Sequence, residues 1–103
     1  LVMPKKHYRD ITEIPSEELC RVIEVVKVVT MAVMRALKAP GVRIVQNNGA
    51  EAGQVIFHIH FHVIPMTGHA SSRHYLTDEE GREVSAALSR EVREILRAGG
   101  GNT

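Results

Sequence analysis

The stretch HIHFHVIP, residues 58–65, places three of the chain's six histidines at every second position. Successive side chains of a β-strand point to opposite faces, and neighbours on one face lie about 6.5–7 Å apart. We therefore predict that His58, His60 and His62 share one face, whereas the apolar residues between them face the core. One histidine on a strand is commonly structural, but three in alternation favour a functional site.

Two kinds of site could use such a row of histidines. Zinc is often held by three imidazoles, but ligands on one extended strand spread too far to meet at one ion without a second strand. A catalytic row tolerates this spread, because one histidine can attack while its neighbours orient it and bind charge. The spacing therefore favours a catalytic row over a metal-binding module.

The loop NNGAEAG, residues 47–53, precedes the histidines and supplies neutral polar groups. Asn47, Asn48 and Gln54 carry amides, and Gly49 and Gly53 allow backbone N–H groups to approach a ligand closely. Read alone, the loop is equally well a simple hairpin turn. Beside three histidines, amides and exposed N–H groups suit a phosphate.

The remaining elements indicate an α+β fold. A helix is predicted from about Ser16 to Lys38, where Ala39-Pro40-Gly41 ends it. Three extended segments are predicted at residues 1–4, 42–46 and 54–65, the last as a central strand of an antiparallel sheet. A second amphipathic helix, ended by the glycines at 99–101, is indicated by an apolar stripe: Val84, Leu88, Val92 and Ile95.

Length and composition limit the classes of protein. The 103 residues suffice for one domain, 1–103, with 99–103 as a flexible tail, and 44% apolar and 24% charged residues argue against disorder. A net charge of +1 gives no general attraction to nucleic acid, and charged residues interrupt the longest apolar run, 19–37, so no membrane span is expected. Cys20 is the only cysteine, which indicates a reducing, cytoplasmic location.

Two further expectations concern the ends and faces of the elements. The chain opens at Leu1 inside an apparent strand, so an N-terminal portion of the domain is expected to be missing. On the long helix, Val28 and Met31 lie within the charged arc. A helix covered on one side only would have polar residues at these two positions. This pattern predicts a second contact surface, and therefore a homodimer.

QNNGAEAGQ followed by HIHFHVIP resembles the signature of the histidine-triad (HIT) nucleotide hydrolases and transferases, and LVMPKKHY resembles their strand before the long helix. The resemblance covers residues 1 to about 65 and is greatest to the bacterial histidine-triad nucleotide-binding, or purine nucleoside phosphoramidase, branch. It implies a HIT-like α+β fold with an antiparallel sheet, a long helix and a C-terminal helix. It also implies a homodimer that hydrolyses nucleoside phosphoramidates or related adenylylated substrates at the α-phosphorus.

The resemblance also implies roles for individual residues. His60 would be the nucleophile, oriented through the main-chain carbonyl of His58, and His62 would contact the phosphate. Asn47 and Gln54 would bind the nucleotide and its phosphate, with a purine nucleotide as the substrate.

No cofactor is expected. Some members bind zinc through a C-x-x-C pair, a histidine at the His7 position and the first triad histidine, and this chain has no such pair. Val55 stands where members commonly have serine or threonine, and Met66 stands where many bacterial members have arginine. The alternative functions are a dinucleoside polyphosphate hydrolase, or a nucleotide-binding or scaffold protein with little turnover.

Overall fold

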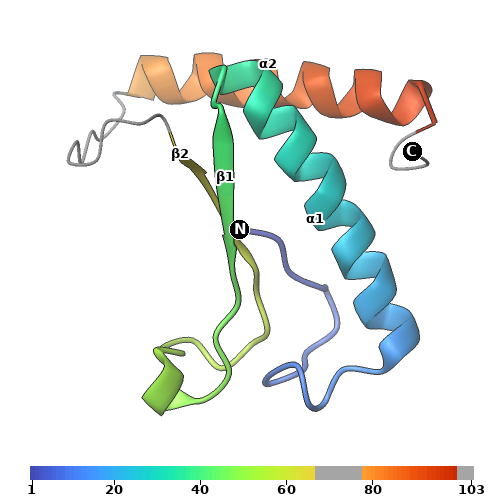
Figure 1. Cartoon of the computed structure of the whole chain (residues 1–103), viewed down its shortest axis with the longest axis vertical. Coiled ribbons are helices and arrows are strands. Elements are labelled where there is room, and N and C mark those ends of the chain that lie inside the picture. The colour runs from blue at the N-terminus through green and yellow to red at the C-terminus, as the bar shows by residue number, and fades with distance from the viewer. Residues whose placement is uncertain (67–77, 100–103) are drawn as a thin grey trace.

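The computed structural model describes residues 1–66 and 78–99 and has two helices beside a two-stranded antiparallel sheet (Figure 1). The predicted α+β class is therefore confirmed. Of the predicted tail, residues 100–103 lie outside the described residues. The elements in chain order are α1 (Ser16–Leu37), β1 (Gly41–Val45), the 3-10 turn η1 (Ala50–Ala52), β2 (His62–Met66) and α2 (Asp78–Arg97).

Helix α1 begins and ends close to the predicted positions. Two carboxylates, Glu17 and Glu18, lie in its first turn, where they face the positive end of the helix dipole. At its other end Lys38 adopts the left-handed conformation, with φ of 50°, and its N–H donates to the Met34 carbonyl. Pro40 follows two residues later and prevents the helix from continuing.

The sheet is smaller than the sequence predicted. Strand β1 pairs with β2 so that Val45 lies opposite His62, but residues 54–60 form no strand. The predicted strand at 1–4 is reduced to a single bridge between Val2 and Phe61. The long strand predicted at 54–65 is thus wrong before Phe61. The main-chain N–H groups of Ile59 and Phe61 bind the carbonyls of Tyr8 and Val2 instead of β1.

The buried core joins the N-terminal segment, the first half of α1 and the histidine segment. The apolar residues between the histidines face inward as predicted, since Ile59 is fully buried, Phe61 is buried and Val63 packs against them. The Tyr8 hydroxyl donates to Glu18 at 2.7 Å and so fastens the N-terminal segment to α1. The buried members of this core are Val2, Tyr8, Ile14, Val22, Val26, Ile59 and Phe61.

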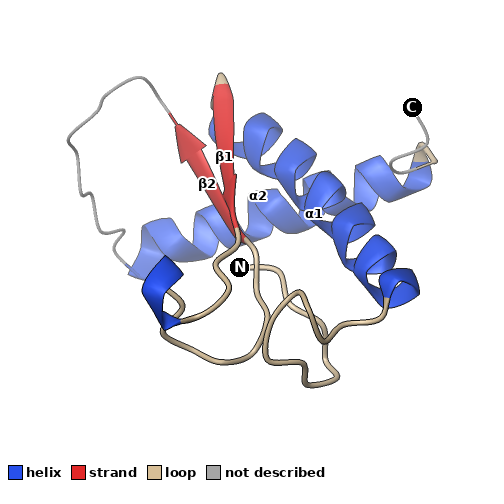
Figure 2. Ribbon diagram, turned by 60° about the horizontal axis from the view of Figure 1, so that its bottom comes forward, coloured by secondary structure: helices blue, strands red, loops and turns tan. Residues whose placement is uncertain are grey.

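Helix α2 packs across the C-terminal part of α1, as Figure 1 and Figure 2 both show. Its predicted apolar stripe is the covered side, with Ile95 buried and Val84, Leu88 and Val92 partly buried. In Figure 1 the loops that carry η1 lie at the opposite end of the molecule from α2. Neither helix within residues 1–66 and 78–99 is long and apolar enough to cross a membrane.

We predict that Ile59→Ala lowers the free energy of unfolding by about 2–5 kcal/mol, because it leaves a cavity in a fully buried position. Ile64→Ala is the matched control, since Ile64 is also in the histidine segment but is 39% exposed. Urea denaturation measures both values. Equal losses for the two variants would contradict the assignment of Ile59 to the core.

Candidate functional site

The histidine segment keeps its alternation although most of it is not in the β-ladder. Two reciprocal main-chain hydrogen bonds join Phe61 to Val2, at 2.8 and 2.9 Å, and the Ile59 N–H donates to the Tyr8 carbonyl at 2.8 Å. These bonds keep the segment extended beside residues 2–8. The side chains of His58, His60 and His62 are therefore partly exposed on the face opposite Ile59.

The ring of His60 is fixed in one tautomer. Its Nδ1 lies 2.7 Å from the main-chain carbonyl of His58. A carbonyl oxygen only accepts, so Nδ1 carries the proton and Nε2 of the neutral ring has an available lone pair. The ring of His62 lies edge-on at a centroid distance of 4.9 Å. The structure thus contains the His58–His60 contact that the family resemblance implied.

The ring of His58 is fixed in the opposite tautomer. Its Nε2 lies 2.8 Å from the Pro4 carbonyl and must donate to it. Nδ1 of the neutral ring is then an acceptor, and it receives a hydrogen bond from Nδ1 of His7 at 3.0 Å. The His7 ring also stacks on His58 with centroids 5.2 Å apart. Both nitrogens of His58 are occupied, so this ring is placed to orient its neighbour rather than to attack.

His7 and His58 are the two positions at which the resemblance would put metal ligands. Within the described part of the chain, no group of three or more His, Cys, Asp or Glu side chains is arranged to hold a metal ion. Two imidazoles do not complete the tetrahedral set of a structural zinc site. The described residues therefore do not fit that group, and no step of the chemistry is assigned to it.

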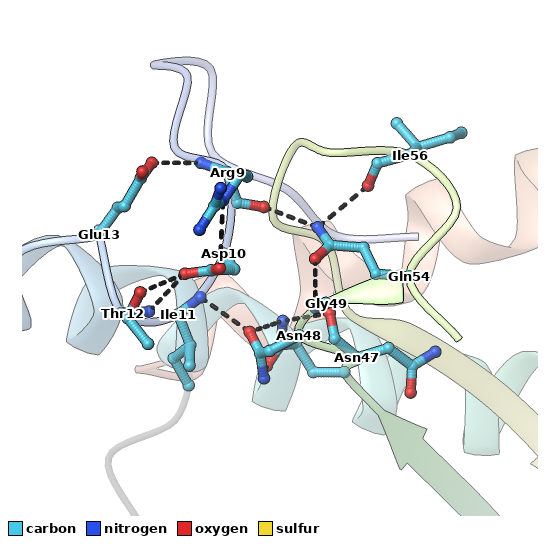
Figure 3. A network of polar contacts seen from close by, with 11 residues as sticks. Arg9, Asp10, Ile11, Thr12, Glu13, Asn47, Asn48, Gly49, Gln54 and Ile56 are labelled. Atoms are coloured by element: carbon cyan, nitrogen blue, oxygen red, sulfur yellow. Dashed lines mark hydrogen bonds and ion pairs between the residues drawn. The ribbon is translucent and has the colours of Figure 1, made fainter. Parts of the chain in front are cut away.

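The three amides of the loop have different surroundings (Figure 3). Asn48 is engaged, because its Oδ1 accepts from the Ile11 N–H and it exchanges two side-chain hydrogen bonds with Gln46. Gln54 is buried and engaged at both ends of its amide. Among the described residues the Asn47 side chain has no hydrogen-bond partner, and Figure 3 shows it turned away from the network. Asn47 is thus the loop amide available to a ligand.

The sequence analysis missed the acidic centre of this network, Asp10. The Thr12 hydroxyl does most to lower the pKa of the Asp10 carboxyl below 3.8. The Thr12 N–H and the Arg9 guanidinium, whose Nε is 3.4 Å away, act in the same direction, and burial opposes them. An aspartate two residues before a threonine is a common local turn pattern, and that was the available signal.

Val55 is the most exposed of three consecutive apolar residues between the loop and the histidines. It is 84% exposed, and Ile56 and Phe57 are also exposed. A valine offers no hydrogen bond to a phosphate or a leaving group, in contrast to the serine or threonine of the family pattern.

The sequence pattern of the HIT domain matches residues 1–69, which include all three histidines and the loop. The chain belongs to the HIT family. The predicted resemblance is therefore confirmed. Among solved structures, a HIT nucleotide-binding protein of Sulfolobus tokodaii superposes with a TM-score of 0.86 at 29% identity, covering 98% of this chain and 73% of that one.

Two curated HIT relatives illustrate the range of the matches. An uncharacterised HIT-like protein of Methanocaldococcus jannaschii is 51% identical over 65 residues, which are 63% of this chain and 50% of the relative. An adenylylsulfatase of Arabidopsis thaliana is 38% identical over 65 residues, which are 63% of this chain and 33% of the relative. The chain spans about half the length of the first curated relatives that it matches.

We predict that Thr12→Val raises the pKa of Asp10 towards its ordinary value, because the variant loses the hydroxyl that stabilises the carboxylate. A carboxyl with a lowered folded-state pKa stabilises the protein above its unfolded pKa and loses this effect as pH falls through the folded pKa. The stability difference between wild type and Thr12→Val should therefore be complete above about pH 4 and vanish on further acidification.

An NMR titration of the Asp10 carboxyl measures this pKa, and urea denaturation across the same pH range measures the stability difference. Thr12→Ser is the control, since it keeps the hydroxyl and should leave the pKa of Asp10 low. An unchanged Asp10 titration in Thr12→Val would contradict the assignment.

Proposed function

We propose that this HIT chain is part of a nucleotide-binding hydrolase that attacks the α-phosphorus of nucleoside phosphoramidates or related adenylylated substrates. The observation that carries the proposal is the 2.7 Å contact between His60 Nδ1 and the His58 carbonyl. It leaves the lone pair of Nε2 in the neutral imidazole as the nucleophile. The adenylylsulfatase among the relatives supports the same class of reaction.

The proposed reaction has two displacement steps. His60 Nε2 attacks the α-phosphorus and forms an N–P bond, while the bond to the leaving group breaks and the leaving group departs with its electron pair. An amine leaving group takes up a proton from solvent. Water then attacks the same phosphorus and loses a proton to solvent, the N–P bond breaks, and a nucleoside monophosphate is released with His60 restored.

The surrounding groups would bind the substrate rather than react. His62 lies beside the His60 ring and would contact the phosphate, and the available amide of Asn47 would donate to the nucleotide. His58 would act through its carbonyl, with its own ring held by Pro4 and His7. Donors fixed in advance around a phosphate stabilise the charge of the transition state at little reorganisation cost.

A second candidate function is nucleotide binding with little turnover. The exposed Val55 favours it, because this side chain cannot hydrogen-bond a leaving group. Hydrolysis of dinucleoside polyphosphates is the alternative within enzymes. Turnover of adenosine 5′-phosphoramidate and of diadenosine polyphosphates, measured beside binding of adenosine 5′-monophosphate, separates the three.

We also propose that the protein is a homodimer that associates through α1. Four apolar or small side chains fall within about 80° on one side of this helix, given about 100° per residue. Ile23 and Met34 are exposed at 45% and 37%, and a second copy packed on this side of the helix would remove their apolar surface from water. Cys20 is exposed as well, so it is available for the proposed interface. The four residues are Cys20, Ile23, Met31 and Met34.

We predict that His60→Ala abolishes turnover of adenosine 5′-phosphoramidate, because it removes the nucleophile, and that binding of adenosine 5′-monophosphate stays within about threefold. His62→Ala should slow the reaction without abolishing it, because that side chain contacts only the phosphate.

Phosphorus NMR of rapidly quenched protein provides the direct measurement and should show an N–P bond at Nε2 of residue 60. A covalent label found on another residue, or an active His60→Ala variant, would sink this mechanism.

We predict that Ile23→Lys produces a monomer, because its cation would lie one helical turn from Lys27, and two like charges would be buried together in the proposed interface. Val25→Lys is the control, since Val25 is similarly exposed but lies about 200° round the helix from Ile23. Light scattering over a range of concentrations measures association. A wild-type chain that is monomeric throughout would overturn the dimer.

A further inference from the structure

The side-chain amide of Gln54 uses both its oxygen and its nitrogen in hydrogen bonds to the main chain. Gln54 is 3% exposed, and its Oε1 accepts from the Gly49 N–H at 2.8 Å. Its Nε2 donates to the carbonyls of Arg9, at 2.7 Å, and Ile56, at 3.1 Å. The main-chain N–H of Gln54 in turn donates to the Gly49 carbonyl at 3.0 Å. One residue thereby closes the loop 49–54 and fastens it to Arg9, 45 positions earlier in the sequence.

These bonds leave Gln54 no means of binding a phosphate directly. A primary amide has two N–H donors, and both are engaged with carbonyl oxygens. The remaining atom is an acceptor, which a phosphate oxygen does not need. A direct contact would require Gln54 Nε2 to give up its hydrogen bond to one of these two carbonyls. The sequence-based role of Gln54 as a phosphate ligand therefore conflicts with its hydrogen bonds.

The closed loop instead determines where Asn47 lies. Gly49 and Gly53 have φ values of +90° and +95°, a conformation that favours glycine and lets the chain turn back tightly here. A Cβ built on Gly53 would be 3.7 Å from Asn47 Nδ2, so the Asn47 amide rests over Gly53 at the end of the closed loop. A loop opened at Gln54 would move this support.

A second hydrogen bond joins the loop to the N-terminal segment, beside the one from Gln54 to Arg9. The Ile11 N–H donates to Asn48 Oδ1 at 2.8 Å, so two neighbouring amides of the loop are bound to the segment 9–11 (Figure 3). Asp10 and Thr12 stabilise that segment from within. The loop is therefore held against the segment 9–11, and the Asn47 amide points away from that segment.

We propose that Gln54 is a positioning residue: it holds the loop 47–53 so that the Asn47 amide meets the nucleotide phosphate, and it does not touch the phosphate itself. The proposal rests on the proposed function for the identity of the ligand. Its geometric part, the closure of the loop by the Gln54 side chain, can be tested without any ligand.

The first test uses the unliganded chain. In Gln54→Met, a substitution of similar volume, hydrogen exchange of the Gly49 amide measured by NMR should become at least about tenfold faster, because its acceptor is lost. Gln46→Met is the matched control: Gln46 bonds to Asn47 and Asn48 in the same loop but not to the Gly49 N–H. Unchanged exchange at Gly49 in Gln54→Met would overturn the proposal.

The second test is a double-mutant cycle on binding of adenosine 5′-monophosphate. Gln54→Met and Asn47→Ala should each weaken binding about tenfold, the size expected of one hydrogen bond to a charged group. Because Gln54 is proposed to act through Asn47, the double variant should bind no more than about tenfold more weakly than wild type. Additive losses, about 100-fold together, would mean that Gln54 binds the phosphate independently and would overturn the proposal.

Two controls separate the possible failures. If Gln54→Met does not fold, Gln54→Asn takes its place in the cycle, since this shorter neutral amide cannot reach both the Gly49 N–H and the Arg9 carbonyl. The same non-additivity with Asn47→Ala is expected. If the wild-type chain binds no adenosine 5′-monophosphate, the proposed function fails, whereas the exchange measurement still decides whether Gln54 closes the loop.

Discussion

The hydrogen bond from His60 Nδ1 to the His58 carbonyl is the contact on which the rest of the site depends. It lies just before β2, whose pairing with β1 begins at His62. The same bond fixes which ring nitrogen of His60 carries the proton. The main chain of His58 therefore orients the proposed nucleophile, and the alternating side chains bury Ile59 and Phe61 on the opposite face.

Residues 1–14 contain no helix or strand, but they supply the hydrogen bonds that hold the histidine segment where it does not pair with β1. Val2 pairs with Phe61, the Pro4 carbonyl accepts from His58, and the Tyr8 carbonyl accepts from the Ile59 N–H. The Arg9 carbonyl and the Ile11 N–H then bind the side chains of Gln54 and Asn48. These partners lie far along the sequence, so the conformation of this segment is determined by tertiary contacts and not by local propensity.

The sequence predicted the parts of the fold that depend on local patterns. Alternation identified the shared face of His58, His60 and His62, and periodicity identified both helices. It overestimated the second strand, because an apolar, β-branched run predicts pairing but cannot reveal that Ile59 and Phe61 will bind the N-terminal segment. Residue type also suggested Gln54 as a phosphate ligand, and it could not show that both side-chain donors bind main-chain carbonyls. Asp10 gave only a weak turn signal, and its role depends on the fold around it.

The single thiol of the chain has a practical consequence. Cys20 is exposed on α1, and the sequence contains no other cysteine to compete with it. A maleimide-linked spin label can therefore be attached at one defined position without any mutagenesis. A partner copy on that side of α1 would cover the thiol and slow the attachment of the label as protein concentration rises, whereas a rate independent of concentration would mean that this side stays exposed.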